Sequence, residues 1–361
     1  MIIIISLVFT ALTILIAIYA TNQTTTKANG HTLLGIALPH TALKNEKVIE
    51  ITKKYTKNHT LNTVVFAILT LPMFLASAAP IAVTLYLLLW CTIFIYINQK
   101  IFLNHFHTLY NLKKTNNWWL GTHQLVTIDT EVSRLKNTFP IQKKYFLIPI
   151  LITSITIFII FFKTTDTTLW TFAFSGLLPL LSLLIIYFIY SKSRSVVYSD
   201  NSEINLQLNR MFKREWTTCC FTVATIQSVL FLATTIILLT APNRSFDIAF
   251  FLIMSAQTFS MMFIIFRTHQ KISTTRNKMR YLINEELYED DDLCWAYFGG
   301  LFYYNPNDIR VVVEKRIGVG LALNMATIVG KVVMAILILM IVPLFLSIAY
   351  YALEELSGIL G

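Results

Sequence analysis

The residues best suited to chemistry lie in a short polar stretch of the C-terminal third. Three consecutive aspartates, Asp290 to Asp292, end a run of six acidic residues between positions 282 and 292. Hard divalent cations prefer carboxylate oxygens, but the ordered spacing of a calcium loop is missing here. Five basic residues precede the run between positions 267 and 280, so we expect the opposite charges to pair with one another or with neighbouring loops. A divalent-cation site is the alternative.

The residues after the aspartates extend this candidate functional patch. Residues 298–304 and 309–316 are rich in aromatic and β-branched side chains, and the turn-forming stretch Asn305 to Asp308 separates them, which predicts a β-hairpin. A lone hairpin is marginally stable in water, so we expect it to lean on the membrane, on other loops or on a partner. The patch comprises Asp290, Asp291, Asp292, Trp295, Tyr303, Tyr304, Asn305, Asp308, Lys315 and Arg316.

A second group of possible ligands contains His105, His107 and His123. In an extended segment the first two imidazoles would point to the same side, as two ligands of a metal ion do. Zinc needs three or four ligands, and no carboxylate or thiol lies at a suitable spacing. We therefore predict no metal site.

The sequence lacks the short motifs of common active sites. Neither H-E-x-x-H nor G-x-S-x-G occurs, and Gly330-Lys331 is followed by Val332 rather than by the Ser or Thr of a phosphate-binding loop. Gly318-Val-Gly320 has no third glycine at position 323. We expect no enzymatic activity, no catalytic residues and no cofactor.

The composition indicates where the chain resides. Of its 361 residues, 55% are hydrophobic and only 13% are charged, whereas soluble domains carry about 25% charged residues. Much of the surface must therefore face something other than water. The composition predicts an integral membrane protein.

Eight apolar segments are long enough for a helix to cross a hydrocarbon core of about 30 Å. They cover residues 1–20, two short helices that divide 61–97 at Pro80, 145–162, 168–190, 216–240, 248–266 and 332–350. The predicted fold is an all-α integral membrane protein with about eight transmembrane helices and a small cytosolic β-hairpin before the last helix.

This pattern divides the chain into five parts. An N-terminal membrane module of three helices and a basic loop (1–97) is followed by a cytosolic loop (98–144), two helical hairpins (145–266), a cytosolic acidic segment with the β-hairpin (267–317), and a C-terminal helix with a short outer tail (318–361).

The orientation follows from the basic residues. The four loops 21–60, 98–144, 191–215 and 267–317 hold 26 of the 29 Lys and Arg residues, and loops rich in these residues stay in the cytosol. We predict a multipass plasma-membrane protein with both termini outside and all long loops cytosolic. The basic face suits anionic inner-leaflet lipids, and nucleic-acid binding is not expected, because no compact basic patch with exposed aromatic residues occurs.

The first cytosolic loop contains a candidate amphipathic helix. Leu43, Val48, Ile51 and Tyr55 fall near one helical face, and lysines fall elsewhere, which predicts a helix lying on the membrane surface. A solvated linker helix is the alternative.

Two segments resemble modules of uncharacterised multipass membrane proteins of Gram-positive bacteria. The first is Thr32-Leu-Leu-Gly-Ile-Ala-Leu-Pro39, which resembles a module of SdpI-type immunity proteins, and the second runs from Asp290-Asp-Asp-Leu-Cys-Trp295 to Val313-Glu-Lys-Arg-Ile-Gly-Val-Gly320 and resembles a domain of unknown function. The likeness covers about residues 1–97 and 285–350.

The resemblance implies immunity or envelope-stress protection against membrane-active peptides as the leading expectation. The alternative is a transporter or an accessory subunit of a transport or signalling complex, which would use residues 267–320 to dock a membrane or cytosolic partner.

Overall fold

The computed structural model describes residues 2–75, 80–120, 135, 138–163, 167–193, 195–197, 201–240, 243–280, 291–300, 302–336 and 338–339. Helices dominate them, and the regular strands form two two-stranded sheets, so the all-α prediction is confirmed. The chain divides into two compact units: unit 1 contains Met1–Val126 and Leu287–Gly361, and unit 2 contains Thr127–Glu286.

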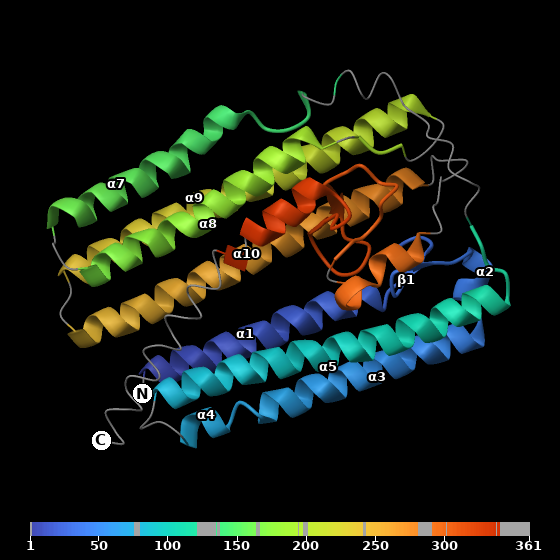
Figure 1. The fold of residues 1–361 in the computed structure, drawn as a ribbon, viewed down its shortest axis with the longest axis horizontal. Helices are drawn as coiled ribbons and strands as arrows, with labels where there is room; N and C mark the ends of the chain where they lie inside the picture. Colours follow the sequence, from blue (N-terminus) through green and yellow to red (C-terminus); the bar gives the residue numbers. More distant parts are fainter. Residues whose placement is uncertain are drawn as a thin grey trace. The chain divides into compact units, whose positions relative to one another are not determined.

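Three long helices form the frame of unit 1: α1 (Ile2–Thr25), α3 (Glu46–Ile68) and α5 (Pro80–Thr115) pack side by side (Figure 1). Short helices α2 (His40–Leu43) and α4 (Pro72–Leu75) flank α3. Asn45 caps α3 by accepting a hydrogen bond from the Lys47 amide, and Pro80 is the first residue of α5, a position that needs no amide donor.

The helices continue well beyond the predicted membrane segments. Helix α5 has 36 residues, or about 54 Å at 1.5 Å per residue, almost twice the hydrocarbon thickness. The expected loop that starts at residue 98 is therefore helical as far as Thr115. In α3, Val48 and Tyr55 are buried in the core of unit 1, so the prediction of a surface-lying amphipathic helix was wrong: its apolar face packs against protein.

A tight hairpin connects α1 to α2. Strands β1 (Thr32–Leu33) and β2 (Ile36–Ala37) pair antiparallel, and Leu34 and Gly35 between them both have positive φ, 49° and 82°. This is the backbone of a two-residue turn whose twist matches that of the strands.

The second hairpin differs from the predicted one. Strand β3 (Val312–Glu314) pairs antiparallel with β4 (Leu321–Leu323), whereas residues 298–300 belong to the 3-10 helix η4 (Tyr297–Gly300). The turn at 305–308 was predicted correctly, since the Asp308 amide donates to the Asn305 carbonyl over 3.3 Å. It does not join the paired strands, however; the connection through 315–320 does, with Gly318 and Gly320 at φ 78° and 108°. A further helix begins at residue 328, and most of the predicted 332–350 segment lies outside the described residues.

In the part of unit 2 that the structure describes, four long helices form a bundle in which α9 (Ser202–Thr240) contacts the other three. The others are α7 (Leu147–Lys163), which follows the 3-10 turn η2 (Lys143–Phe146), α8 (Thr167–Lys192) and α10 (Asn243–Arg280). Buried Lys213 of α9 donates to the Ser193 carbonyl over 2.6 Å, just beyond the C-terminal end of α8, where a cation is favourable.

Four described helices are long and apolar enough to cross a membrane, in the stretches Leu7–Thr25, Ala82–Thr115, Lys143–Lys163 and Ser202–Thr240. Each of these stretches contains all or most of one predicted membrane segment. The helices are thus compatible with an integral membrane protein.

Candidate functional site

The carboxylate of Asp292 lies at the centre of a buried charge cluster in unit 1. Asp292 is the first residue of the 3-10 helix η3 (Asp292–Trp295), and its side chain is fully buried. It accepts hydrogen bonds from the Lys113 Nζ over 2.5 Å, from the Arg316 Nη1 over 2.9 Å and from the Ala37 amide over 3.0 Å. The carboxylate therefore joins α5, the first hairpin and the loop that follows β3.

Arg316 extends the cluster to the neighbouring aspartate. One arm of its guanidinium donates to Asp292, and the other, Nη2, donates to Asp291 Oδ1. The guanidinium carbon lies 5.7 Å from the centre of the Trp295 ring, a favourable cation–π distance, and the Trp295 indole donates to Asp291 Oδ2 over 3.3 Å. The planar fork of arginine suits two adjacent acceptors, as lysine would not.

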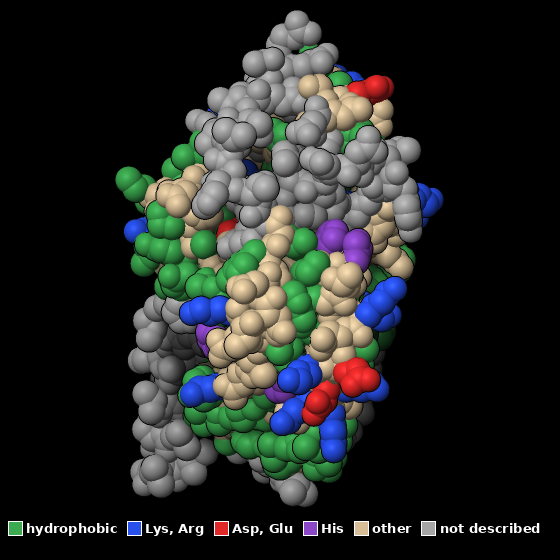
Figure 2. Space-filling model, turned by 90° about the vertical axis from the view of Figure 1, so that its right-hand side faces the viewer, with side chains coloured by type: hydrophobic (Ala, Val, Ile, Leu, Met, Phe, Trp, Pro, Cys, Tyr) green, Lys and Arg blue, Asp and Glu red, His purple; other side chains and the backbone are tan. Residues whose placement is uncertain are grey.

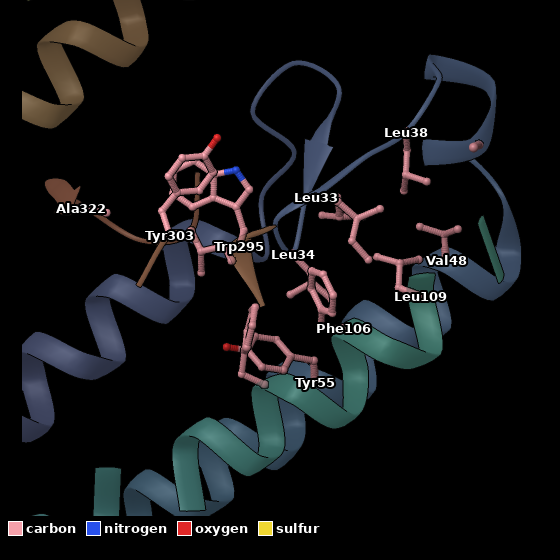
Figure 3. Close-up of a cluster of buried hydrophobic side chains, with 14 of the residues drawn as sticks. Leu33, Leu34, Leu38, Val48, Tyr55, Phe106, Leu109, Trp295, Tyr303 and Ala322 are labelled. Carbon is pink, nitrogen blue, oxygen red and sulfur yellow. The ribbon is translucent and has the colours of Figure 1, made fainter. Parts of the chain in front are cut away.

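Tyr303 links this cluster to a second ion pair. Its hydroxyl lies 3.1 Å from Asp308 Oδ2 and 3.4 Å from Asp291 Oδ2, and its single proton can be donated to only one of them at a time. Figure 3 shows the rings of Trp295 and Tyr303 lying together, and their centroids are 4.4 Å apart. Arg310 neutralises Asp308 through Nε and Nη2, the latter at 2.6 Å.

Asn324 fixes the turn that carries Asp308. It is fully buried, donates from Nδ2 to the carbonyls of Asn305 and Asp308 over 3.0 and 2.7 Å, and accepts from the Asn305 amide over 3.1 Å. The Asn305 side chain donates in turn to the Tyr303 hydroxyl over 2.9 Å. The backbone and side chains around Tyr303 therefore form one hydrogen-bonded network.

The charges in this network balance. Asp291 and Asp292 face Lys113 and Arg316, and Asp308 faces Arg310. Burial raises the pKa of Asp292, against the opposing influence of Arg316 and Lys113. Burial, with the charges of Asp291 and Asp308, raises the pKa of Tyr303 above 10. The pKa of Asp308 is lowered. Burial alone would raise it, but the hydrogen bonds and the charge of Arg310 outweigh the effect of burial. Such a balanced set of pairs is suited to holding segments together.

The structure brings most of the predicted patch together. Asp291, Asp292, Trp295, Tyr303, Asn305, Asp308 and Arg316 belong to the network, and Asp290 lies outside the described residues. Tyr304 packs on Tyr297 instead, with 4.9 Å between ring centroids. Lys315 is half-buried, burial lowers its pKa, and its side chain has no hydrogen-bond partner among the residues that the structure describes.

Sequence reasoning missed Lys113, Arg310 and Asn324. Lys113 was assigned to a loop, because hydropathy stops at the membrane surface whereas the helix continues. Asn324 follows the apolar stretch Leu321–Leu323, and a polar side chain directly after an apolar stretch is a signal that was available. Arg310 lies two residues after Asp308, in the segment that was predicted as a regular strand.

The histidines do not form the predicted geometry of an extended pair. His105 and His107 both lie in α5. Two positions along an α-helix correspond to a rotation of about 200° around its axis, so the two imidazoles point to different sides. His105 is buried and its Nδ1 lies 2.7 Å from the Ile101 carbonyl, whereas His107 is exposed. His123 lies outside the described residues.

A second polar layer lies between α1, α3 and α5. Tyr55 donates to Asn22 Oδ1 over 3.1 Å, and the Asn22 amide also contacts His59 Nε2. Within the described part of the chain, three buried atoms of this region have no hydrogen-bond partner: His59 Nδ1, Asn62 Nδ2 and Asn98 Oδ1. Buried polar atoms of this kind commonly bind ordered water.

Comparison with protein-family models, with curated proteins and with solved structures finds no match to this chain. The likeness to SdpI-type immunity proteins therefore stays a prediction.

Proposed function

We propose that the chain is a multipass plasma-membrane protein, with eight crossings and both termini outside, that protects the membrane against membrane-active peptides. The observation that carries this proposal is the buried charge cluster of unit 1. It joins the first hairpin, the end of α5 and residues 291–324 into one folded cap. A cap of this kind is a dedicated structure and not a set of passive connecting loops.

The position of the cap supports a cytosolic site of action. Its members come from segments that hold most of the basic residues, and such segments remain inside. The predicted outer connectors at 163–167 and 241–247 are short, so little protein would be available outside to capture a peptide. Protection would act within the bilayer or through the cap, and it requires no catalytic group, cofactor or nucleic acid.

A gene deletion tests this function directly. Cells that lack the protein should become more sensitive to at least one peptide of a broad membrane-active panel. The wild-type gene should restore resistance, and a D292A gene, which disrupts the cap, should not, at matched membrane abundance. Unchanged killing curves across the panel would remove the proposal.

Topology is tested separately. Single cysteines placed at position 57 and at position 165, in a background without the four native cysteines, should react differently with an impermeant maleimide in intact cells. We expect labelling at 165 alone. Labelling at 57 would reverse the proposed orientation.

The second candidate is a transporter or an accessory subunit, favoured by polar side chains inside unit 2. The Thr153 hydroxyl donates to Ser228 over 2.9 Å, and the buried Gln227 Oε1 has no partner among the described residues. Polar groups inside membrane helices can line a pathway. Co-purification in mild detergent distinguishes the two candidate functions, since a stoichiometric ATPase or sensor kinase would favour the accessory role.

A further inference from the structure

A groove runs along the outer face of α3, between this helix and the segment that leads from α1 to α2. Its volume is about 820 Å³. Leu33 and Leu43 form its wall on the side of the first hairpin, and α3 contributes residues from Val48 to Val64. The groove therefore belongs entirely to unit 1 and is separate from the charge cluster.

The α3 side of the groove changes character along the helix. Ile49, Lys53, Lys57, Thr60 and Val64 recur at three- and four-residue intervals and share one helical face. Lys53 and Lys57 are exposed. Towards the predicted membrane segment the same face becomes apolar, and Leu61 and Val64 are 60% and 51% exposed.

The predicted membrane segment places the basic part of the groove at the height of lipid headgroups. Leu61 is the first residue of the predicted membrane segment. Lys57 and Lys53 precede it by about 6 and 12 Å along the helix axis, at 1.5 Å per residue. The headgroup layer on each side of the hydrocarbon is roughly 5 to 8 Å thick, and lysine side chains can extend several ångströms along a helix to reach it.

The charge of the groove selects its occupant. Among the described residues that line it, none is acidic. A neighbouring hollow of about 680 Å³ on the other side of α3 carries Lys47 and Lys54, but Glu50 also lines it. Figure 2 likewise shows basic side chains with acidic ones among them on the face it presents. The α3 groove thus combines two exposed lysines, with no acidic residue in its described lining, and an apolar extension.

We propose that this groove binds one anionic phospholipid of the inner leaflet. Its phosphate lies between Lys53 and Lys57, where the ammonium groups and the Thr60 hydroxyl can donate hydrogen bonds to it. One acyl chain follows Leu61 and Val64 into the bilayer. The inner-leaflet position rests on the orientation proposed above; the binding chemistry does not.

Native mass spectrometry of the full-length chain, purified in mild detergent, tests the site with phosphatidylglycerol and phosphatidylcholine as probes. The wild-type chain should retain one phosphatidylglycerol at concentrations at which phosphatidylcholine is lost. K53Q/K57Q should bind phosphatidylglycerol about 30-fold more weakly, as expected for two lysines that each contribute about five- to sixfold. The matched variant K47Q/K54Q, on the same helix, should bind as the wild type does.

Two results would overturn the proposal. One is equal weakening in K53Q/K57Q and K47Q/K54Q, which would indicate nonspecific attraction to the basic helix. The other is equal retention of phosphatidylcholine, which would exclude charge selection. Unchanged melting temperatures of both variants establish that the fold is intact.

A short-chain lipid tests the apolar half. Dihexanoyl phosphatidylglycerol should bind more weakly than the long-chain form, and L61S/V64S should abolish this difference. Equal binding of both lipids to the wild type would contradict the acyl-chain contact. Because the measurement uses purified protein and no peptide, it stays informative if the protective function or the topology proves wrong.

Discussion

The Nζ of Lys113 lies 2.5 Å from Oδ2 of Asp292, and neither side chain is exposed to solvent. The Lys113 ammonium also lies 4.9 Å from the centre of the Trp119 ring. A buried ion pair tolerates the loss of one partner poorly, because the remaining charge stays in a medium of low dielectric constant. The pair is therefore a sensitive point of unit 1.

Removing this carboxylate should destabilise the protein strongly. D292A removes one hydrogen-bond acceptor from both Lys113 and Arg316, and we expect the free energy of unfolding to fall by about 3–5 kcal/mol. Thermal unfolding in detergent measures the change. E215A is the matched control, because Glu215 pairs with the exposed Lys271 in unit 2, and such a pair contributes at most about 1 kcal/mol. Equal effects of the two substitutions would contradict a structural role for the cluster.

Arg316 should not be replaceable by lysine. R316K keeps the charge but cannot direct two coplanar donors at Asp291 and Asp292, and it lacks the planar guanidinium that lies 5.7 Å from the centre of the Trp295 ring. We expect faster amide hydrogen exchange throughout residues 291–324. K315R, the conservative change at the neighbouring position, should leave the exchange unchanged; if it has the same effect, the fork geometry is not what matters.

Two glycines with positive φ should respond differently to a methyl group. A Cβ at Gly35 would lie 2.5 Å from the Ile317 Cγ1, whereas one at Gly320 meets nothing within 4 Å. G320A therefore reports backbone strain alone, and G35A adds a steric clash of about 1–3 kcal/mol. Melting temperatures of the two variants check this order. G35A should therefore melt below G320A, and a lower melting temperature of G320A would contradict the expected clash with Ile317.

Alkaline pH should weaken unit 1 through Tyr303. The pKa of this hydroxyl is raised above its ordinary value of 10, first by burial and then by the charges of Asp291 and Asp308. The folded state therefore holds the proton more tightly than the unfolded state. The resulting contribution to stability is complete below pH 10 and is lost as the pH rises from 10 towards the folded-state pKa.

The comparison with Y303F isolates this contribution. The fall in melting temperature between pH 9 and pH 11 should be smaller in the variant than in the wild type, after each is referred to its own value at pH 8. Parallel curves would mean that Tyr303 does not titrate differently in the two states. Other groups that ionise in this range are common to both chains and cancel.

Sequence patterns predicted most of the apolar helices and placed their ends poorly. The first helix predicted within 61–97 is instead the end of α3, which stops at Ile68, followed by the short helix α4. Hydropathy detects the part of a helix in contact with lipid, and α5 passes from apolar Phe94 to charged Lys113 without a change in backbone structure. The pairing of the strands β3 and β4 was also missed, because the sequence contains two possible turns. Asn305 to Asp308 and Ile317 to Gly320 are both turn signals, and only tertiary contacts decide which of them joins paired strands.

Only part of the candidate site could be predicted from the sequence. The acidic run that ends at Asp292 indicated charge pairing from its residue types alone, and the basic residues between 267 and 280 or neighbouring loops were the expected partners. The partner on α5 could not be located, because a contact between residues 179 positions apart depends on how the 3-10 helices η3 and η4 pack against α5. Burial of Asp292 was likewise not visible, since a run of aspartates ordinarily faces solvent.

The division of unit 1 between the two ends of the chain has a consequence for biosynthesis. At about 5–20 residues per second, roughly 10 to 35 s separate the synthesis of Lys113 from that of Asp292, which follows it by 179 residues. During this interval the α5 ammonium has no carboxylate at its final site, and the first hairpin lacks the acceptor of its Ala37 amide. The cap therefore closes only after unit 2 has left the ribosome, which makes an intact C-terminal segment a checkpoint for the assembly of the N-terminal one.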